Sequence, residues 1–91
     1  MKKIIIDLRK SIYHMSSNKE IIENTINIPL KEIESGIKRL NISKQTRIYV
    51  FCKCDKGSKI AIEKLRKMGY VNIVDLIDVE HAQKLIPKII F

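Results

Sequence analysis

The sequence predicts a single α/β domain with a small, mainly parallel sheet and helices on both of its faces. Short apolar runs alternate along the chain with segments in which apolar residues recur at helical spacing. Strands that alternate with helices are joined by right-handed crossovers, so neighbouring strands run parallel. The first apolar run, Ile4 to Ile6, is continuous rather than alternating, which is typical of a strand buried on both faces. The whole chain, residues 1–91, fits one such domain.

Each element has its own signal in the sequence. The helices are predicted from apolar residues three or four positions apart, with Gly69 placed to end the second helix and Pro87 the third. Ser17 and Glu20 have the spacing of a capping box, which would begin a further short helix. The strands are predicted over residues 3–8, 25–28, 47–52 and 72–77, and the helices over residues 30–40, 58–68 and 79–86.

Composition narrows the classes of partner. The net charge of +8 favours anionic partners. The few aromatic residues are not interleaved with a basic stripe, so we expect no nucleic-acid partner. No apolar run approaches the roughly 18 residues of a membrane span, so no membrane association is expected. The two cysteines stand one residue apart and do not form the disulfide framework of a secreted domain, so we expect a cytoplasmic protein with reduced thiols.

Cys52 is the strongest candidate for a reactive residue. It ends the apolar run that begins at Arg47, and a lysine-rich stretch then leads into a helix. The carboxyl end of a buried strand is where α/β proteins bind ligands. A helix N-terminus and the lysines of that stretch (Lys53, Lys56 and Lys59) favour the thiolate, which is the reactive form of cysteine. The alternative, from the residues alone, is a small buried apolar side chain that ends a strand.

Four segments in the same order resemble the rhodanese-like family of sulfurtransferase domains. Ile5 to Arg9 resembles the family's Asp-Val-Arg signature, and Ile22 to Pro29 resembles its segment that ends in Asn-Ile-Pro. Arg47 to Ser58 is similar to the family's central strand and active-site loop. Ala61 to Ile73 follows the family's Ala-x-x-Leu-x-x-x-Gly-Phe-x-Asn-Val pattern. The resemblance covers about residues 3 to 85 and implies the rhodanese-like α/β fold.

The resemblance implies that Cys52 takes a sulfane sulfur from a small anionic donor, such as thiosulfate or polysulfide. The persulfide then passes this sulfur to a thiol or protein acceptor, and no metal or organic cofactor is implied. The backbone amides of the next residues would cradle the anion: Lys53, Cys54, Asp55, Lys56, Gly57 and Ser58, with Lys59 beside them.

Two departures from the family pattern bear on activity. The family loop commonly reads Cys-x-x-Gly-x-Arg-Ser, so Asp55 stands in the glycine position and Gly57 in the arginine position. The missing arginine removes a bidentate anion donor, which lysines replace only as point charges. The family's usual Gly-Gly pair after the last strand is replaced by Ile77 and Asp78. These changes bear on activity towards thiosulfate more than on the fold.

Other residues near the loop leave alternatives open. Cys54 either resolves a persulfide on Cys52 or is an incidental second thiol, and we prefer the second interpretation because a ring closed across one residue is strained. A metal site is not expected, since neither histidine stands at a ligand spacing. Phosphatase chemistry is disfavoured because Ser58 stands where a Cys-x5-Arg enzyme has its arginine. Asp7 and Arg9 are predicted to support the site through an ion pair or through loop hydrogen bonds rather than to act on substrate.

Two hypotheses about function follow. The first is a small cytoplasmic sulfurtransferase, an enzyme that carries sulfur as a Cys52 persulfide. The alternative is a catalytically weakened rhodanese-like module with a binding or regulatory role, whose basic surface docks an acidic protein.

Overall fold

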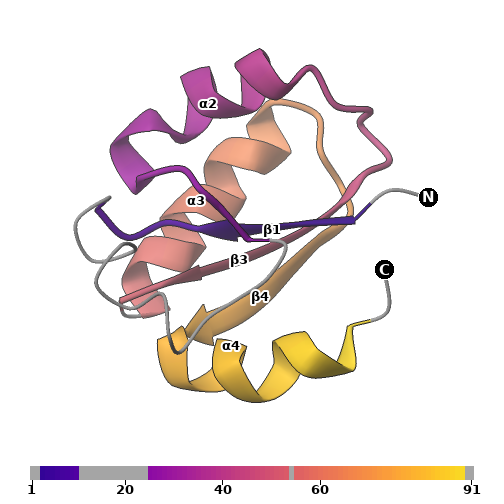
Figure 1. Cartoon of the computed structure of the whole chain (residues 1–91). Coiled ribbons are helices and arrows are strands. Elements are labelled where there is room, and N and C mark those ends of the chain that lie inside the picture. The colour runs from indigo at the N-terminus through magenta and orange to yellow at the C-terminus, as the bar shows by residue number, and fades with distance from the viewer. Residues whose placement is uncertain (1–2, 11–24, 54, 90–91) are drawn as a thin grey trace.

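The four strands of the described residues run parallel in one sheet, in the order β2-β1-β3-β4 (Figure 1). They are β1 (Lys3–Asp7), β2 (Thr25–Asn27), β3 (Arg47–Cys52) and β4 (Ile73–Asp78). The computed structural model describes residues 3–10, 25–53 and 55–89, so the capping box expected at residues 17–20 lies outside the described part. The α/β architecture predicted from the sequence is confirmed.

The two central strands are apolar because both of their faces are covered. Neighbouring side chains of a strand point to opposite faces, yet Ile5 and Ile6 of β1 are both fully buried. The same holds for Val50 and Phe51 of β3. The burial of β1 on both faces, predicted from its continuous apolar run, is therefore confirmed.

Helices cover the two faces of the sheet and create one hydrophobic cluster on each (Figure 1). One face carries the 3-10 turn η1 (Leu30–Glu32), α2 (Ile33–Leu40) and α3 (Asp55–Lys67). The other carries α4 (Val79–Leu85) and the 3-10 turn η2 (Ile86–Lys88). The first cluster includes Ile6, Ile33, Ile37, Val50, Ala61 and Leu65. The second comprises Ile5, Tyr49, Phe51, Leu76, Ala82 and Ile86.

The end of α3 agrees with the sequence prediction at Gly69, whereas the end of α4 differs from the one predicted at Pro87. Gly69 has a φ of +100°, and the N–H of Tyr70 donates to the carbonyl of Leu65 at 3.1 Å, so the glycine stop predicted for α3 is confirmed. At the third helix, α4 ends at Leu85, and Pro87 lies inside a further 3-10 turn instead of ending the helix. A proline fits there because the first turn of a helix leaves its N–H groups unpaired.

The last strand ends in an irregular step. Val50 pairs with Asp75 and Cys52 pairs with Asp78, so β4 has one residue more than β3 between these pairs. Ile77 lies in this bulge with a φ of +72°, and its N–H donates to Asp75 Oδ1 at 2.7 Å. A left-handed conformation is unusual for a β-branched residue. It occurs where the family pattern has glycine.

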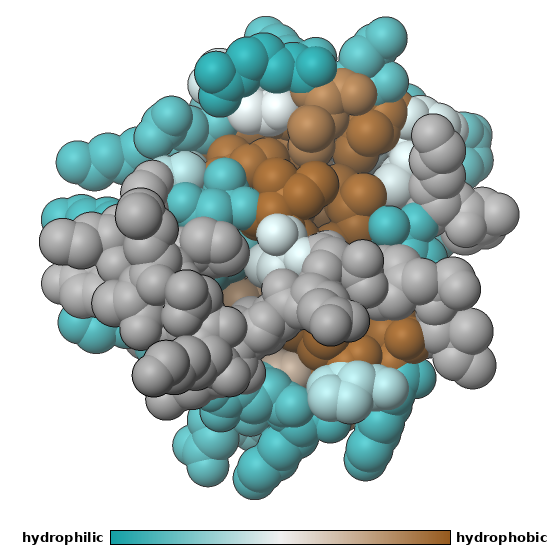
Figure 2. Space-filling view, viewed as in Figure 1, coloured by the Kyte–Doolittle hydropathy of each residue, from teal (hydrophilic) through white to brown (hydrophobic). Residues whose placement is uncertain are grey.

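The surface carries both hydrophilic and hydrophobic side chains (Figure 2). On the face shown in Figure 2, hydrophilic side chains cover the upper and lower margins, where α2 and α4 lie. In the part of the chain that the structure describes, no helix is both long and apolar enough to cross a bilayer.

Candidate active site

Cys52 is the last residue of β3, at the carboxyl end of the sheet. Because side chains alternate along a strand, its thiol points to the face covered by α2 and α3, where it packs against the cluster around Ile6 and Val50. The residue is half-buried and is not in a disulfide. It therefore combines a fixed backbone position with access from one side.

The helix that follows Cys52 begins earlier than the sequence predicted. We expected a loop through Ser58, but α3 starts at Asp55, so only residues 53–54 separate the strand from the helix. An acidic residue is favourable in the first turn, where the positive end of the helix dipole lies. Gly57 and Ser58 are buried in this first turn and Lys56 is exposed. The predicted loop of amides is thus mostly the first turn of a helix.

Gly57 lies against the thiol. A β-carbon at position 57 would stand 2.5 Å from Cys52 Sγ and 3.0 Å from its Cβ. It would also be 3.8 Å from Leu30 Cδ2. Only glycine fits between the thiol and the backbone of α3, and the absence of a side chain brings the helix N-terminus into contact with the sulfur. From the sequence alone, this position was notable only because the family loop commonly has an arginine there.

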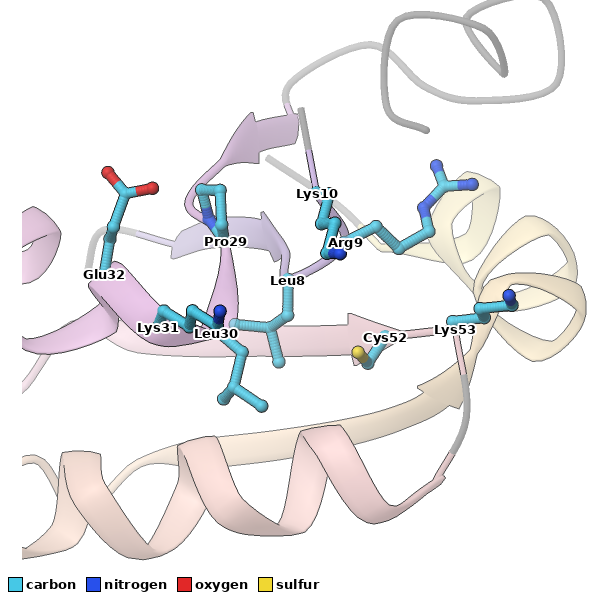
Figure 3. Close-up of a pocket in the computed structure, with 9 residues that line it drawn as sticks. All are labelled: Leu8, Arg9, Lys10, Pro29, Leu30, Lys31, Glu32, Cys52 and Lys53. Atoms are coloured by element: carbon cyan, nitrogen blue, oxygen red, sulfur yellow. The ribbon is translucent and has the colours of Figure 1, made fainter. Parts of the chain in front are cut away.

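The thiol lies in a pocket of about 510 Å³ (Figure 3). Its walls are residues 8–10, which follow β1, residues 29–32, which follow β2, and residues 52–53 at the end of β3. Parallel strands end at the same edge of a sheet, which explains why three separate segments meet here. Of the predicted site residues, Cys52, Lys53 and Arg9 line the pocket, whereas Lys56 and Lys59 do not.

Most residues that form the walls of the Cys52 pocket were not predicted from the sequence. Leu8, Lys10, Pro29, Leu30 and Lys31 all line the pocket, and none had been assigned to the site. The available signal was positional, because residues just after β1 and β2 must meet those after β3 if the three strands are neighbours. That neighbourhood is a property of the strand order, which the sequence does not state.

Asp7 and Arg9 form the predicted ion pair. Arg9 Nη2 lies 2.8 Å from Asp7 Oδ2, and Arg9 Nε donates to Oδ1 at 3.0 Å. Both side chains are buried, with 7% and 0% of their surfaces exposed. The guanidinium lies 5.8 Å from the centre of the Phe51 ring, which belongs to the face covered by α4. The pair therefore fixes the backbone beside the pocket, and its charge is turned away from the thiol (Figure 3).

Asn27 is a supporting residue that the sequence did not reveal. Its side-chain amide donates to the carbonyls of Asp7 and Arg9, at 3.0 Å and 2.9 Å. These two hydrogen bonds connect β2 to the end of β1 and hold the backbone where the chain leaves β1. Asn27 thereby helps to fix the backbone of residues 8–10, which form one wall of the pocket.

The pocket combines an apolar interior with positive charge. The side chains of Leu8 and Leu30 border the thiol, while those of Lys10 and Lys31 stay on the pocket side and that of Lys53 extends towards α4 (Figure 3). Within the described ranges, no group of three His, Cys, Asp or Glu side chains is placed to hold a metal ion. An arrangement of this kind can hold an anion beside the sulfur of Cys52.

Comparison with known proteins adds an independent line of evidence. The family model for the rhodanese-like domain matches residues 1–78. The adenylyltransferase and sulfurtransferase uba4 of Ogataea parapolymorpha is 39% identical over 56 residues, which are 62% of this chain and 14% of the relative. The thiosulfate sulfurtransferase PspE of Escherichia coli is 35% identical over 54 residues, which are 59% of this chain and 52% of the relative.

Solved structures are similar over more of the chain. A rhodanese-like domain of the Alr3790 protein from Anabaena superposes with a TM-score of 0.74 at 19% identity, over 90% of this chain and 91% of that domain. A rhodanese from E. coli, solved with anions, superposes with a TM-score of 0.69 at 26% identity, over 87% and 89% of the two chains. The first of these likenesses concerns the fold alone.

Proposed function

The chain belongs to the rhodanese-like domain family, and on that basis we propose that it is a sulfurtransferase that carries sulfur on Cys52. The observation that supports this proposal most is the contact between the Cys52 thiol and the first turn of α3 at Gly57, inside an accessible pocket. The positive end of a helix dipole favours negative charge beside it. A persulfide anion on Cys52 would receive this stabilisation.

The proposed reaction has two displacements. The Cys52 thiolate attacks the sulfane sulfur of thiosulfate, its bond to the sulfonate sulfur breaks, and sulfite leaves with that electron pair. A polysulfide donor reacts in the same way and leaves as a shortened polysulfide. A nucleophilic acceptor then attacks the outer sulfur of the persulfide, and the Cys52 thiolate is regenerated. No oxidant or reductant is consumed, because sulfur moves as a neutral atom between nucleophiles.

A binding or regulatory role is the alternative, supported by the basic surface. The chain has a net charge of +8, and exposed basic side chains lie on both helices of the Cys52 face: Lys38, Arg39, Lys56, Lys59, Arg66 and Lys67. Such a surface attracts acidic proteins. In this alternative the protein docks a partner but does not turn over.

Turnover separates the two proposals. The reduced protein is mixed with cyanide and either thiosulfate or polysulfide, and thiocyanate is measured over time. We expect catalysed thiocyanate formation by the wild type and by the matched control Cys54→Ser, and none by Cys52→Ser. A wild-type rate no faster than buffer with both donors would contradict the enzyme and favour the binding module.

A further inference from the structure

We infer that a second pocket, at the amino ends of the strands, docks an acidic segment of a protein partner through one bulky apolar side chain. The inference goes beyond the proposed function and does not depend on sulfur transfer, because the second pocket and Cys52 lie at opposite ends of the sheet. Arg47 and Cys52, the two end residues of β3, are roughly 17 Å apart at about 3.3 Å per residue.

The second pocket forms where α2 and α3 end, before the chain enters β3 and β4 (Figure 1). One wall comes from residues 37–44, and the other comes from Met68 and Tyr70. Its volume is about 330 Å³, near the lower limit of roughly 300 Å³ for sites that hold a whole small molecule. A pocket of this size suits a large side chain that a partner inserts.

The lining of the second pocket is mainly apolar. Ile37 is fully buried in the core on the α2 and α3 face, and Ile42 and Met68 are half-buried against the same core. The hydroxyl of Tyr70 donates to the carbonyl of Ile42 at 3.2 Å, so this polar group is already engaged. Methionine and tyrosine are common where proteins bind each other. Such a lining favours the burial of an apolar side chain.

Two helix ends hold the walls in place. Asn41 ends α2 with a φ of +49°, and its N–H donates to the carbonyl of Lys38 at 3.2 Å. Gly69, which lies between Met68 and Tyr70, ends α3 with a φ of +100°. Both ends are left-handed caps, which fix the direction of the chain. A site with fixed walls costs little to order when a partner binds.

The charges at the second pocket are positive. Lys38 and Lys44 line it, and none of its lining residues is acidic. Lys44 Nζ lies 4.2 Å from the centre of the Tyr70 ring, a cation–π contact that places this ammonium group beside the apolar lining. Glu34 and Glu63, on the adjoining helices, each pair with a lysine of α3. The pocket therefore attracts carboxylates that stand next to an apolar group.

This combination selects an acidic protein segment as the occupant. A second copy of the chain would bring two net charges of +8 together. A nucleic acid would need an aromatic face on which to stack its bases, but Tyr70 is only 3% exposed. Leu40 and Val71, which are 37% and 81% exposed, adjoin lining residues in the sequence and add apolar surface at this end of the molecule. Apolar surface outside the pocket favours a protein over a small acid.

The test is an NMR titration of the isotope-labelled chain with three synthetic peptides of equal length. The first has one phenylalanine between glutamates, the second has serine in place of the phenylalanine, and the third has lysines in place of the glutamates. We expect the first peptide to shift the signals of residues 37–44 and 68–70, with an affinity that decreases as salt is added. The serine peptide should bind at least about tenfold more weakly, and the lysine peptide should not bind.

Variants locate the contact. Lys38→Ala and Lys44→Ala should each weaken binding of the phenylalanine peptide by about two- to fivefold, and Lys44→Glu should weaken it further. Met68→Ser should weaken binding of the phenylalanine peptide but not that of the serine peptide. The matched control is Lys88→Ala, which removes an exposed lysine outside the second pocket and should leave the affinity unchanged. Unchanged signals away from the substitution show that each variant is folded.

Equal affinities for the phenylalanine and serine peptides, or shifts centred on other residues, would overturn the inference. A single-stranded oligonucleotide that shifts the same signals at lower concentration than the peptide would assign the surface to nucleic acid, and self-association in sedimentation that Lys44→Glu abolishes would assign it to a second copy. Either result would also contradict the inference. Lys44→Glu should load sulfur on Cys52 as the wild type does, measured by intact mass, so a failure of the proposed function is seen separately.

Discussion

Gly57 and Cys52 lie so close that a β-carbon on residue 57 would stand 2.5 Å from the sulfur. This contact links the central strand to the first turn of α3 and leaves no room for a side chain between them. It also explains why a glycine occupies a helical position, where the residue is otherwise unfavourable.

Gly57→Ala should lower both stability and the reactivity of Cys52. Alanine gains about 1 kcal/mol over glycine within a helix, but overpacking of this kind costs about 1–3 kcal/mol. We therefore expect a net loss of about 1 kcal/mol in the free energy of unfolding and slower alkylation of Cys52, measured by urea unfolding and by intact mass. Lys56→Ala, an exposed change in the same turn, is the matched control. Alkylation of Gly57→Ala at the wild-type rate would show that the contact does not position the thiol.

Ile77→Gly should stabilise the protein. Ile77 has a φ of +72°, and a non-glycine residue held in such a conformation costs about 1–3 kcal/mol. Glycine adopts this conformation without strain, but the half-buried isoleucine side chain is lost, so we expect a net gain of about 1 kcal/mol in urea unfolding. The control Val74→Gly changes the same strand at a regular position and should destabilise it. Equal losses in both variants would mean that Ile77 is not strained.

Arg9→Leu should reduce stability by about 3–5 kcal/mol, because it removes the guanidinium that pairs with the buried carboxylate of Asp7. Replacing both members, as Asp7→Asn with Arg9→Leu, should recover much of this loss, measured by urea unfolding. The result separates a structural ion pair from a substrate contact. If Arg9→Leu left stability unchanged and abolished sulfur transfer, the guanidinium would act on substrate instead.

Asp78 should make stability depend on pH in the acid range. Its carboxylate accepts the backbone N–H of His81 at 2.9 Å and contacts the His81 ring, and these hydrogen bonds lower the pKa of Asp78 below its ordinary value of 3.8. A carboxyl group whose pKa is lowered on folding stabilises the protein above its unfolded pKa, and this contribution is lost as pH falls through the folded pKa.

The matching experiment compares wild type with Asp78→Asn, which keeps the capping oxygen but removes the charge. The wild type should be more stable near neutral pH, and the difference in urea unfolding should decrease once pH falls below about 4. The control Glu80→Gln, an exposed acid in the first turn of α4, should show no such difference. A difference that persists unchanged at the lowest pH would contradict the lowered pKa.

Much of the fold follows from the sequence, because its signals are local. β3 has the predicted bounds, Arg47–Cys52, since a buried parallel strand is apolar throughout its length. The stop of α3 at Gly69 was also predictable, because a left-handed cap requires little beyond the glycine itself. The parallel sheet followed from the alternation of strands and helices.

The features that were missed depend on contacts between distant segments. The start of α3 at Asp55 was not predicted because Asp, Gly and Ser are typical of turns, and here the packing of Gly57 on Cys52 outweighs that preference. Lys10 and Lys31 were missed because only the order of the strands brings them to Cys52. The left-handed Ile77 contradicts local preference altogether.

The most direct test of the central claim is the mass of the intact protein after exposure to a sulfur donor. Reduced wild type, Cys52→Ser and Cys54→Ser are each incubated with thiosulfate and with polysulfide and then desalted. The intact mass of each protein is measured before and after treatment with cyanide. If Cys52 is the carrier, wild type and Cys54→Ser gain the mass of one sulfur atom with at least one donor, cyanide removes it, and Cys52→Ser stays unmodified. A wild type that remains unmodified with both donors, or a Cys52→Ser variant that still gains the sulfur, would contradict the account.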